Sequence, residues 1–379
     1  MRILLVLNAF EEDGPGLLML NLCRIWVNEP DVNIRVVALS RNGALRSRFQ
    51  EMGVPAEYYN TRTLRGFLAF RRSLIQAVQQ GIAPEVIHTN LLWPDLICRY
   101  FCTLVPKAQL ISTNHGLHAV GEKSSLGGKL YGLAERITRG RCNGWIAVSG
   151  FVASALKQAG YNEASIHKIS NGVDCARFSP SPAKVVLRFR RKLGIAPGQP
   201  LLLAVGNFRL VKNHALLIEA MVQVRATFPT VRLMLVGNGP LKATYKKLIR
   251  ERSLQGVVTL HSPKQVVLPL LMSSADLLVH CSHTESFGLV VAETLACQTP
   301  VVVTDVGALP ELVLPGKTGA LVEPDRILPL ASAVCSLLVD PQLRQMLGKN
   351  GRQHIQQHYN IAKTAQQYLA FWRKIRTNS

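Results

Sequence analysis

The chain has 379 residues, of which 48% are hydrophobic and 18% charged, so it can bury real cores and is not expected to be disordered. Its 44 Lys and Arg outnumber 23 Asp and Glu, which gives a formal net charge of +21 and predicts a polyanionic partner: nucleic acid, an anionic membrane surface or a phosphorylated substrate. No stretch approaches about 18 consecutive apolar residues, and Glu11 closely follows the first apolar run, so we expect neither a transmembrane helix nor a signal peptide.

In the first half of the chain, short apolar runs alternate with amphipathic stretches. Runs that are apolar on both faces are typical of a parallel sheet covered by helices. The predicted strands are Ile3–Leu7, Ile34–Leu39, Val86–Thr89, Ala108–Thr113 and Gly144–Val148, and the predicted helices are Leu17–Val27, Leu68–Gln79 and Phe151–Ala159. Ser149 is expected to cap the last of these helices, because a serine hydroxyl can accept a hydrogen bond from the first turn.

The same alternation starts again near residue 200. Its predicted strands are Pro200–Val205, Val231–Val236, Val257–His261, Leu277–His280, Pro300–Thr304 and Gly319–Val322, and its predicted helices are His214–Thr227 and Leu241–Arg252. We therefore predict an α/β protein with a Rossmann-like domain at 1–175, a linker at 176–198 and a second Rossmann-like domain at 199–360. A C-terminal helix is expected at 361–379, with its aromatic residues in ordinary packing. Ligands in such sheets bind at the carboxyl ends of the strands, so we expect a cleft between the two domains.

The eight cysteines are scattered, mostly within apolar runs, and only Cys98 and Cys102 are close in sequence. This pattern has neither the paired spacing of a zinc finger nor the density of a disulfide framework. It predicts reduced, buried thiols and no metal site.

The most informative stretch is His283–Val313, HTESFGLVVAETLACQTPVVVTDVGALPELV, in which Glu285 and Glu293 are eight positions apart. The four residues after the first glutamate are Ser286, Phe287, Gly288 and Leu289. We expect a helix to start there, and the backbone amides at its N-terminus favour a phosphate group. Gly288 would let the backbone approach the ligand closely, and a second carboxylate on the same helix suits a ribose diol.

Other short motifs follow one another along the chain. They are His115 in Ser-Thr-Asn-His-Gly, Ala147-Val148-Ser149, Asn171-Gly172-Val173-Asp174 with Phe178, the segment from Val205 to Asn213, and Val236-Gly237-Asn238-Gly239-Pro240. In this order, and together with Glu-x7-Glu, they resemble the GT-B glycosyltransferases of glycosyltransferase family 4. The resemblance covers nearly the whole chain and implies the GT-B fold, two Rossmann-like domains facing a central cleft.

The resemblance further implies an enzyme of the hexosyltransferase type that transfers a sugar from a nucleotide-diphospho-sugar with retention and without a metal or other cofactor. No Asp-x-Asp pair occurs in the chain. UDP is slightly favoured as the nucleotide, because it is common in the family. Without a metal, cationic side chains and amides must stabilise the leaving diphosphate, and Arg209 and Lys212 are the residues expected to do so.

By the same resemblance, Glu285 contacts donor-sugar hydroxyls, Glu293 binds the ribose and His115 reaches the donor sugar. His115 and Glu285 are thus the predicted catalytic residues. No residue is placed as a nucleophile, so a front-face mechanism is implied, in which the leaving phosphate helps to deprotonate the acceptor.

The chain departs from the family pattern at a few positions. Asn207 stands where the family commonly has arginine, and Arg209 is expected to substitute for it. Gln298 replaces the usual glycine after Ala-Cys, and Gly14-Pro15-Gly16 replaces a Gly-Gly turn, which leaves Gly16 as the candidate for close backbone approach to the donor.

The acceptor is expected to be a saccharide or a lipid-linked saccharide of the cell envelope, in polysaccharide or lipopolysaccharide synthesis. Two basic stretches, Arg62–Arg72 and Gly121–Arg141, match no donor motif. They are either solvated faces or surfaces that attract anionic lipid or a phosphorylated acceptor. The expected location is cytoplasmic, with peripheral attachment to the inner face of the plasma membrane as a further hypothesis.

Two other functions remain open alternatives. One is a nucleotide-sugar hydrolase or epimerase on the same fold, which would need no acceptor. The other is a non-enzymatic nucleic-acid-binding protein, which the charge of +21 suggests. The dispersed basic residues and the lack of a zinc-finger, RRM or basic-zipper signature argue against this second alternative, so no nucleic-acid partner is predicted.

Overall fold

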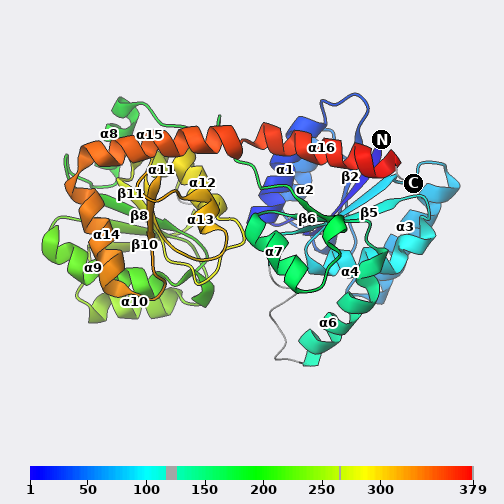
Figure 1. Ribbon diagram of the computed structural model, residues 1–379, viewed down its shortest axis with the longest axis horizontal. Helices are drawn as coiled ribbons and strands as arrows, with labels where there is room; N and C mark the ends of the chain where they lie inside the picture. The colour runs from blue at the N-terminus through cyan, green and yellow to red at the C-terminus, as the bar shows by residue number, and fades with distance from the viewer. Residues whose placement is uncertain (117–125, 264–265, 378–379) are drawn as a thin grey trace. The chain divides into compact units, whose positions relative to one another are not determined.

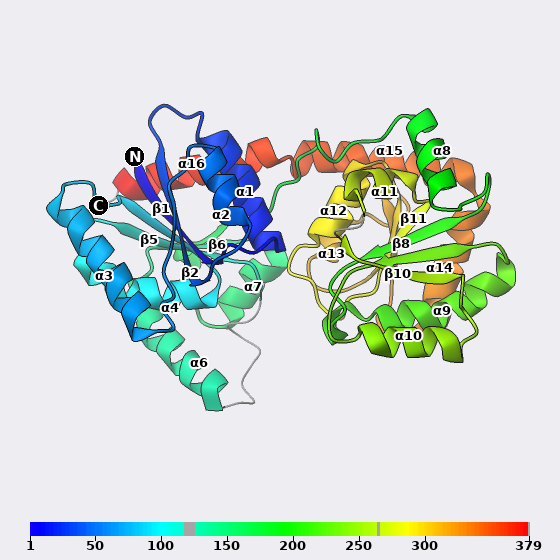
Figure 2. The same cartoon turned by 180° about the vertical axis from the view of Figure 1, so that it is seen from behind.

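The computed structural model describes residues 1–116, 126–263 and 266–377, with backbone only for 126–131. These residues form two compact units, seen from opposite sides in Figures 1 and 2. Unit 1 comprises Met1–Gly172 and Ile361–Ser379, and unit 2 comprises Val173–Asn360. Each unit has its own sheet and its own hydrophobic core. The predicted α/β class, with two Rossmann-like domains, is confirmed.

Within the described part of unit 1, seven strands form a parallel sheet in the order β3-β2-β1-β4-β5-β6-β7. The strands are β1 (Arg2–Ala9), β2 (Asn33–Arg41), β3 (Ala56–Tyr58), β4 (Val86–Asn90), β5 (Gln109–Asn114), β6 (Gly144–Ala147) and β7 (Ile166–Lys168). Every residue of β4 and β6 is buried, as expected for strands covered on both faces. The strand order reverses between β1 and β4.

The helices of unit 1 are α1 (Gly14–Trp26), α2 (Leu45–Glu51), α3 (Leu64–Gln79), α4 (Leu92–Phe101), α6 (Leu126–Thr138), α7 (Gly150–Gln158) and α16 (Ile361–Thr377). Short 3-10 turns lie at Cys102–Leu104, Arg139–Arg141 and Glu163–Ser165. Ser149 caps α7 by accepting a hydrogen bond from Val152 N at 3.1 Å, as predicted.

The last helix of the chain, α16, returns to unit 1 and packs beside α1, as both views show. Trp372 is fully buried, and its ring centroid lies 4.5 Å from that of Trp26. The aromatic residues of the C-terminus therefore complete the core of unit 1, as predicted.

Within the described part of unit 2, six strands form a parallel sheet in the order β10-β9-β8-β11-β12-β13, which reverses between β8 and β11. The strands are β8 (Leu201–Val205), β9 (Arg232–Val236), β10 (Val258–His261), β11 (Leu277–His280), β12 (Val301–Thr304) and β13 (Gly319–Val322). The helices are α8 (Ala183–Lys192), α9 (His214–Thr227), α10 (Lys242–Glu251), α11 (Leu268–Ser274), α12 (Leu289–Ala296), α13 (Leu309–Leu312), α14 (Ile327–Val339) and α15 (Pro341–His358).

The stretch 176–198, expected as a linker, lies within unit 2 and contains α8. Arg190 of this helix pairs with Asp276 at 3.1 Å and also donates to Ser274 O at 2.8 Å, which ties α8 to the segment before β11. The basic residues of this stretch thus belong to a helix on the surface of unit 2.

Among the described residues, no single helix is long and apolar enough to cross a membrane. One helix pair, α14 and α15, meets the requirement of length and composition only when taken together, and it is bent by 101°.

Candidate functional site

In unit 2, polar side chains gather at the carboxyl ends of β8 and β11, where the strand order reverses. Open parallel sheets bind ligands at this point, because the loops that leave the two strands diverge to opposite faces. After β8, the chain passes through a 3-10 turn at Leu210–Lys212 before α9 begins. After β11, it runs through Ser282 to Glu285 and then into α12. The backbone amide of His283 donates to Val211 O at 2.9 Å and so joins the two loops.

Three donors converge on one carboxylate oxygen of Glu285. Its Oε2 atom lies 2.6 Å from Lys212 Nζ, 3.0 Å from His280 Nε2 and 3.3 Å from Ser282 Oγ. Burial alone would raise the pKa of Glu285, but the hydrogen bonds and electrostatic attraction of His280 and Lys212 prevail and lower this pKa to about 2. Glu285 is therefore ionised at neutral pH. Its second oxygen, Oε1, forms no hydrogen bond with any described residue and is available to accept one from a ligand.

The loop that carries Glu285 is held from behind by the segment that follows β12. Ala308 N donates to Glu285 O at 2.8 Å, and a Cβ atom on Gly307 would lie 2.1 Å from the same oxygen. Gly307 also has a φ of +58°, so only glycine fits this position without strain. This contact fixes the backbone from which the Glu285 side chain projects.

The residues between the two glutamates are placed as a turn followed by a helix. Phe287 is buried and packs edge-on against Tyr359, with ring centroids 5.6 Å apart. Gly288, at a φ of +94°, precedes α12, and Leu289 is the first residue of that helix. A Cβ atom on Gly288 would lie 2.7 Å from Leu309 Cδ2, so the turn needs glycine for both its conformation and its packing. Ser286 lies in the same turn, before the positive end of the helix dipole.

Glu293 lies on α12 and is half-buried. Its side chain forms no hydrogen bond with any described residue. Burial raises the pKa of Glu293 to about 8, and the charge of Arg177 opposes this shift only in part. A partly buried carboxyl group without a partner is a typical mark of a ligand site, because its desolvation is left uncompensated in the free protein.

Arg209 is exposed, and its side chain forms no hydrogen bond or ion pair with any described residue. Arg209 thus lies in the same loop as Lys212 without joining the cluster at Glu285.

Gly237 and Gly239 pack against the loop that carries Arg209 and Lys212. A Cβ atom on Gly237 would lie 2.0 Å from Gly206 O, and one on Gly239 would lie 2.6 Å from Phe208 O. Both glycines therefore have a structural reason to be glycine.

His115 lies in unit 1, directly after β5. Its Nε2 atom is 2.9 Å from Asn90 Oδ1, at the end of the neighbouring strand β4. Burial lowers the pKa of His115 to about 4, so the ring is neutral at physiological pH. Because the amide oxygen of Asn90 accepts from Nε2, the lone pair of Nδ1 is left to accept a hydrogen bond from a ligand hydroxyl.

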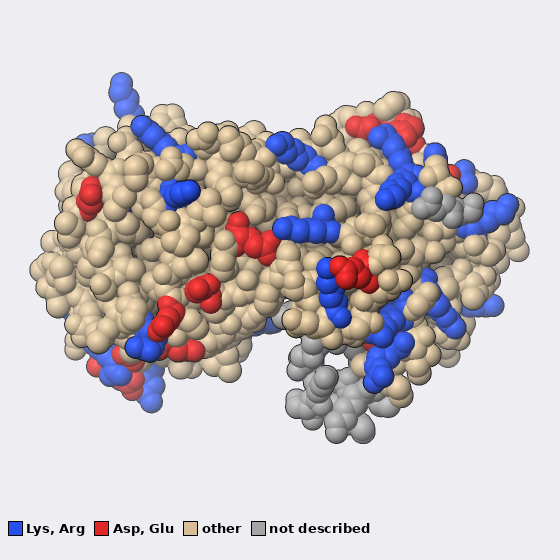
Figure 3. All heavy atoms as spheres, viewed as in Figure 1, with Lys and Arg blue, Asp and Glu red and all other residues tan. Residues whose placement is uncertain are grey.

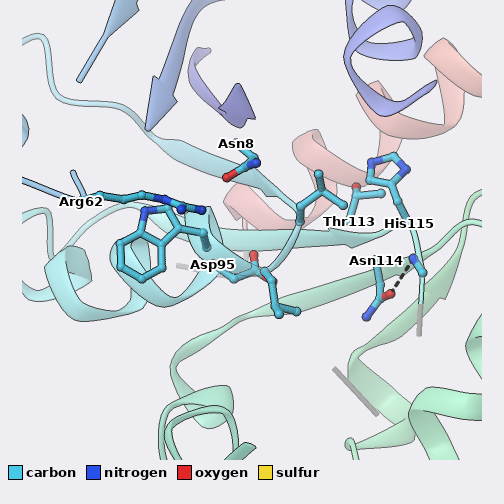
Figure 4. A pocket seen from close by; sticks show the side chains of 10 residues that line it. Asn8, Arg62, Asp95, Thr113, Asn114 and His115 are labelled. Atoms are coloured by element: carbon cyan, nitrogen blue, oxygen red, sulfur yellow. Dashed lines mark hydrogen bonds between the residues drawn. The ribbon is translucent and has the colours of Figure 1, made fainter. Parts of the chain in front are cut away.

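His115 lines a cavity of about 400 Å³ at the carboxyl ends of β1, β4 and β5 (Figure 4). The cavity is lined by Asn8, Arg62, Leu91, Leu92, Trp93, Asp95, Thr113, Asn114, His115 and Gly116. It lies where the strand order of unit 1 reverses, which is the position that the Glu285 cluster occupies in unit 2. Leu91 at its wall has a φ of +72°, an uncommon conformation for a branched residue.

Gly16 lies in the first turn of α1. Its amide donates to Asp13 Oδ1 at 2.8 Å, and a Cβ atom on Gly16 would lie 2.5 Å from Glu11 O. Loop packing therefore accounts for this glycine, and its amide is already occupied by the helix cap.

Sequence reasoning brought Lys212, Glu285 and Glu293 to one unit, but it missed several residues that the structure adds. His280 was placed only as the last residue of a predicted strand, although its position at the carboxyl end of β11 was a signal that it faces the ligand edge. Gly307 gave no signal, because its contact with Glu285 arises only in the folded chain. Arg62 was noted as part of a basic stretch, and Trp93 was not noted at all.

The basic stretch Arg62–Arg72 is now placed in detail, because most of it belongs to α3. Arg65, Arg71 and Arg72 are exposed on this helix. On the face of unit 1 drawn in Figure 3, basic side chains gather over the side that carries α3, α4 and α6. Of the second stretch, Gly121–Arg141, residues 121–125 lie outside the described part of the chain.

We compared the chain with models of known protein families, with curated proteins and with solved structures. Residues 13–177 match the model of Glycosyltransferase Family 4, and residues 186–354 match that of Glycosyl transferases group 1. The chain is 26% identical over 329 residues to an N-acetyl-alpha-D-glucosaminyl L-malate synthase of Bacillus anthracis, covering 83% of each chain.

It is also 30% identical over 222 residues to a GDP-mannose-dependent monoacylated alpha-(1-6)-phosphatidylinositol monomannoside mannosyltransferase of Corynebacterium glutamicum, covering 56% of this chain and 57% of the relative. Among solved structures, HepE of Anabaena in complex with UDP-glucose has the same fold, with a TM-score of 0.85 at 20% identity over 99% of this chain and 100% of the other.

Proposed function

Because the chain belongs to the GT-B glycosyltransferases of family 4, we propose that it transfers a hexose from a nucleotide-diphospho-sugar to an acceptor hydroxyl with retention of configuration. The observation that carries this proposal is the Glu285 cluster: an ionised carboxylate and a lysine held together beside the N-terminus of α12, at the edge of the sheet where ligands bind. Binding of UDP-glucose by the Anabaena protein and the name of the GDP-mannose-dependent relative support a nucleotide-sugar donor.

The diphosphate is the leaving group, and negative charge grows on it as the bond from C1 to the phosphate oxygen breaks. Lys212 supplies a positive charge to it, and the free guanidinium of Arg209 is a second cation within the same loop. The amides that begin α12 add the positive end of its dipole. Glu293 accepts hydrogen bonds from the two ribose hydroxyls.

Glu285 accepts a hydrogen bond from the donor sugar through Oε1, while Oε2 stays anchored by its three donors. His115, neutral and with a lone pair on Nδ1, accepts from a sugar hydroxyl. The acceptor oxygen bonds to C1 on the face that the phosphate leaves, and its proton passes to the departing phosphate. No residue forms a covalent intermediate in this sequence, and these cations carry out the charge stabilisation without a metal.

The acceptor we propose is a saccharide or lipid-linked saccharide of the cell envelope, and the enzyme would act in the cytoplasm at the inner face of the plasma membrane. The relative named for a phosphatidylinositol monomannoside supports a lipid-linked acceptor. Helix α3 supports membrane attachment, because it carries no acidic residue and leaves Leu64 74% exposed and Leu68 38% exposed among its arginines.

Nucleotide binding and product analysis test this proposal. UDP, GDP and ADP and their sugars are compared by thermal shift, and a specific donor should raise the melting temperature by mass action. Transfer should then give a product with the donor's anomeric configuration and should survive EDTA. An inverted product, or activity lost with EDTA and restored by a divalent metal, would contradict it. Sugar released equally with and without candidate acceptors would instead favour a hydrolase.

A further inference from the structure

In the lining of the cavity of unit 1, one cation has no carboxylate partner among the described residues. Arg62 is exposed at the cavity wall, with its Cζ atom 5.8 Å from the centroid of the Trp93 ring (Figure 4). No Asp or Glu among the described residues forms an ion pair with it. A guanidinium stacked on an indole keeps its edge N–H groups free, and that edge matches a phosphate or carboxylate group in two-point fashion.

The indole under Arg62 is itself fixed in place. Trp93 Nε1 donates to Thr61 Oγ1 at 2.9 Å, and Thr61 Oγ1 in turn donates to Leu39 O at 2.8 Å. Thr61 precedes Arg62 in the chain, so the same short segment positions both the ring and the guanidinium. The pair is therefore preorganised, which lowers the entropy that a ligand must overcome on binding.

Asp95 also lines the cavity, but its charge is already compensated. Its Oδ1 accepts from Thr89, and its Oδ2 accepts from Ser112 at 2.7 Å and from Arg99 at 3.4 Å. Asp95 is only 7% exposed and both of its carboxylate oxygens already accept hydrogen bonds, so it does not compete with a ligand for Arg62.

Two asparagine side chains at the wall are arranged as donors. Asn8 Oδ1 accepts from Ser40 Oγ at 3.1 Å, and Asn114 Oδ1 accepts from Gly116 N at 3.1 Å. Each asparagine therefore has its amide nitrogen unused by the described residues, as a hydrogen-bond donor. A cation and two amide donors, with the indole as an apolar platform, complement an anionic group attached to a carbon skeleton.

We propose that this cavity binds an acceptor that carries a phosphate or carboxylate group, with Arg62 as the residue that selects the anion and Trp93 as the platform for its carbon skeleton. The inference rests on the proposed function, because it assigns the chemistry of the acceptor. The anion can belong to a free polyol phosphate or to a lipid headgroup, and both sources present the same charged group to Arg62.

Trp93 also offers a direct readout. Trp26, Trp145 and Trp372 are buried, and Trp93 is the one half-buried tryptophan among the four in the chain. The protein is first saturated with UDP, so that phosphate probes do not occupy the nucleotide site. Tryptophan fluorescence is then titrated with matched pairs: glucose 1-phosphate against glucose, and glycerol 3-phosphate against glycerol. A parallel arm uses vesicles of phosphatidylglycerol against phosphatidylcholine.

We expect a saturable fluorescence change with the phosphorylated probe of a pair, or with the anionic vesicle, and at least about 10-fold weaker binding of its neutral counterpart. Trp93→Phe should remove the signal, and Arg62→Gln should weaken binding by about 10-fold or more. Arg24→Gln, at an exposed arginine of α1 outside both the cavity and α3, is the matched control and should leave binding unchanged. A response to the soluble probes identifies a free phosphate, and one to the vesicles alone identifies a headgroup.

Three results would overturn the inference: equal binding of charged and neutral probes, an Arg62→Gln variant that binds as the parent does, or no saturable response to any anionic probe. The melting shift with UDP is measured on the same variants. If that shift is intact while the anion response is missing, the acceptor assignment fails and the proposed function stands. If no nucleotide shifts the parent protein, the proposed function fails instead.

Discussion

In both units the strand order reverses near the middle of a parallel sheet, and polar side chains gather at the carboxyl ends of the strands beside that reversal. In unit 2 the cation there is already paired, since Lys212 Nζ lies 2.6 Å from Glu285 Oε2. In unit 1 the cation is unpaired, since Arg62 stacks on Trp93 without a carboxylate partner among the described residues.

This difference indicates two uses of charge on one fold. A lysine held by a carboxylate is oriented in advance for charge that develops during bond breaking, so its effect should appear in turnover as well as in nucleotide affinity. An unpaired arginine gains its first counter-ion when a ligand arrives, so its effect should appear as affinity. The variants below separate these two uses.

The largest effect is expected for Glu285→Gln, which keeps the shape of the side chain and removes its charge. Turnover should fall by about 100-fold or more, because in the proposed mechanism a neutral amide stabilises the reacting sugar in the transition state less than the carboxylate does. Affinity for UDP should hold or rise slightly, because Lys212 loses its competing carboxylate. Steady-state kinetics and UDP calorimetry measure the two quantities. Glu323→Gln, at an exposed position of unit 2, should change neither, and a Glu285→Gln variant with parental turnover would remove Glu285 from the reacting centre.

The next effect concerns α3 in unit 1. Replacing Arg65, Arg71 and Arg72 with Gln should weaken binding to anionic vesicles by roughly 100-fold, at about 1 kcal/mol for each basic residue near the surface. Binding of the parent should fall as salt rises, because charges farther apart than about 8–10 Å are screened. Donor affinity should not change, since the nucleotide residues belong to unit 2. Sedimentation with vesicles measures this partition.

A matched control for α3 is available on α10. Replacing Lys246, Lys247 and Arg250 with Gln removes the same charge from a helix without exposed large apolar side chains. If this control weakens vesicle binding as much as the α3 variant, net charge explains the binding and the surface of α3 does not.

Local pattern was enough to predict most strands of the two sheets, although it missed β3 and β7. The strands β4, β8 and β12 are short buried runs whose period and β-branched content are visible in sequence. Lys212 and Glu285 were assigned to the donor site by the resemblance to family 4. Both also follow a predicted strand, and parallel strands bring their carboxyl ends to one edge.

What escaped prediction depends on contacts that sequence spacing does not encode. Gly307 is required because it meets the backbone of Glu285 from another loop, and Arg62 meets Trp93 although 31 positions separate them. The stretch 176–198 was expected as a linker, and its helix α8 lies against α11, a contact between segments far apart in the chain. Such contacts arise from tertiary packing, and neither secondary-structure propensity nor hydrophobic periodicity predicts them.

Lys212→Met should have an effect of intermediate size. The loss of a hydrogen bond to a charged group costs about 1.5–3 kcal/mol, so UDP affinity should fall by about 10- to 100-fold, with a further loss in turnover. Lys246→Met, an exposed lysine of α10, is the control. The comparison with Arg62→Gln is informative: Lys212→Met should change both nucleotide affinity and turnover, whereas Arg62→Gln should raise the KM for the acceptor alone. Equal kinetic signatures would mean that the two units use charge in the same way.

The smallest effect is expected at Glu293, whose pKa is raised from 4.5 to about 8 by burial. At pH 7 the free protein holds this carboxyl mostly protonated, and the two ribose hydroxyls of the proposed complex would favour its ionised form by donating to it. Binding of UDP should therefore release up to one proton, which calorimetry in two buffers of different ionisation enthalpy detects. Glu293→Gln should bind UDP about 10-fold more weakly and release correspondingly fewer protons. Equal proton release by both proteins would refute the ribose assignment.

The raised pKa of Glu293 also determines the direction in which the stability of the folded protein changes with pH. The folded protein binds one more proton than the unfolded chain between pH 4.5 and about 8, so this stabilisation is complete below the lower value and is lost as pH rises through the upper one. The melting temperature of the free protein should thus fall more steeply from pH 5 to pH 9 in the parent than in Glu293→Gln. UDP should flatten the parent's profile, because the nucleotide supplies the hydrogen bonds that the buried carboxyl lacks. If the melting temperature of the parent falls with pH at the same slope as that of the variant, Glu293 is solvated in the free protein. The contrast between an uncompensated carboxyl at Glu293 and an anchored one at Glu285 would then not hold.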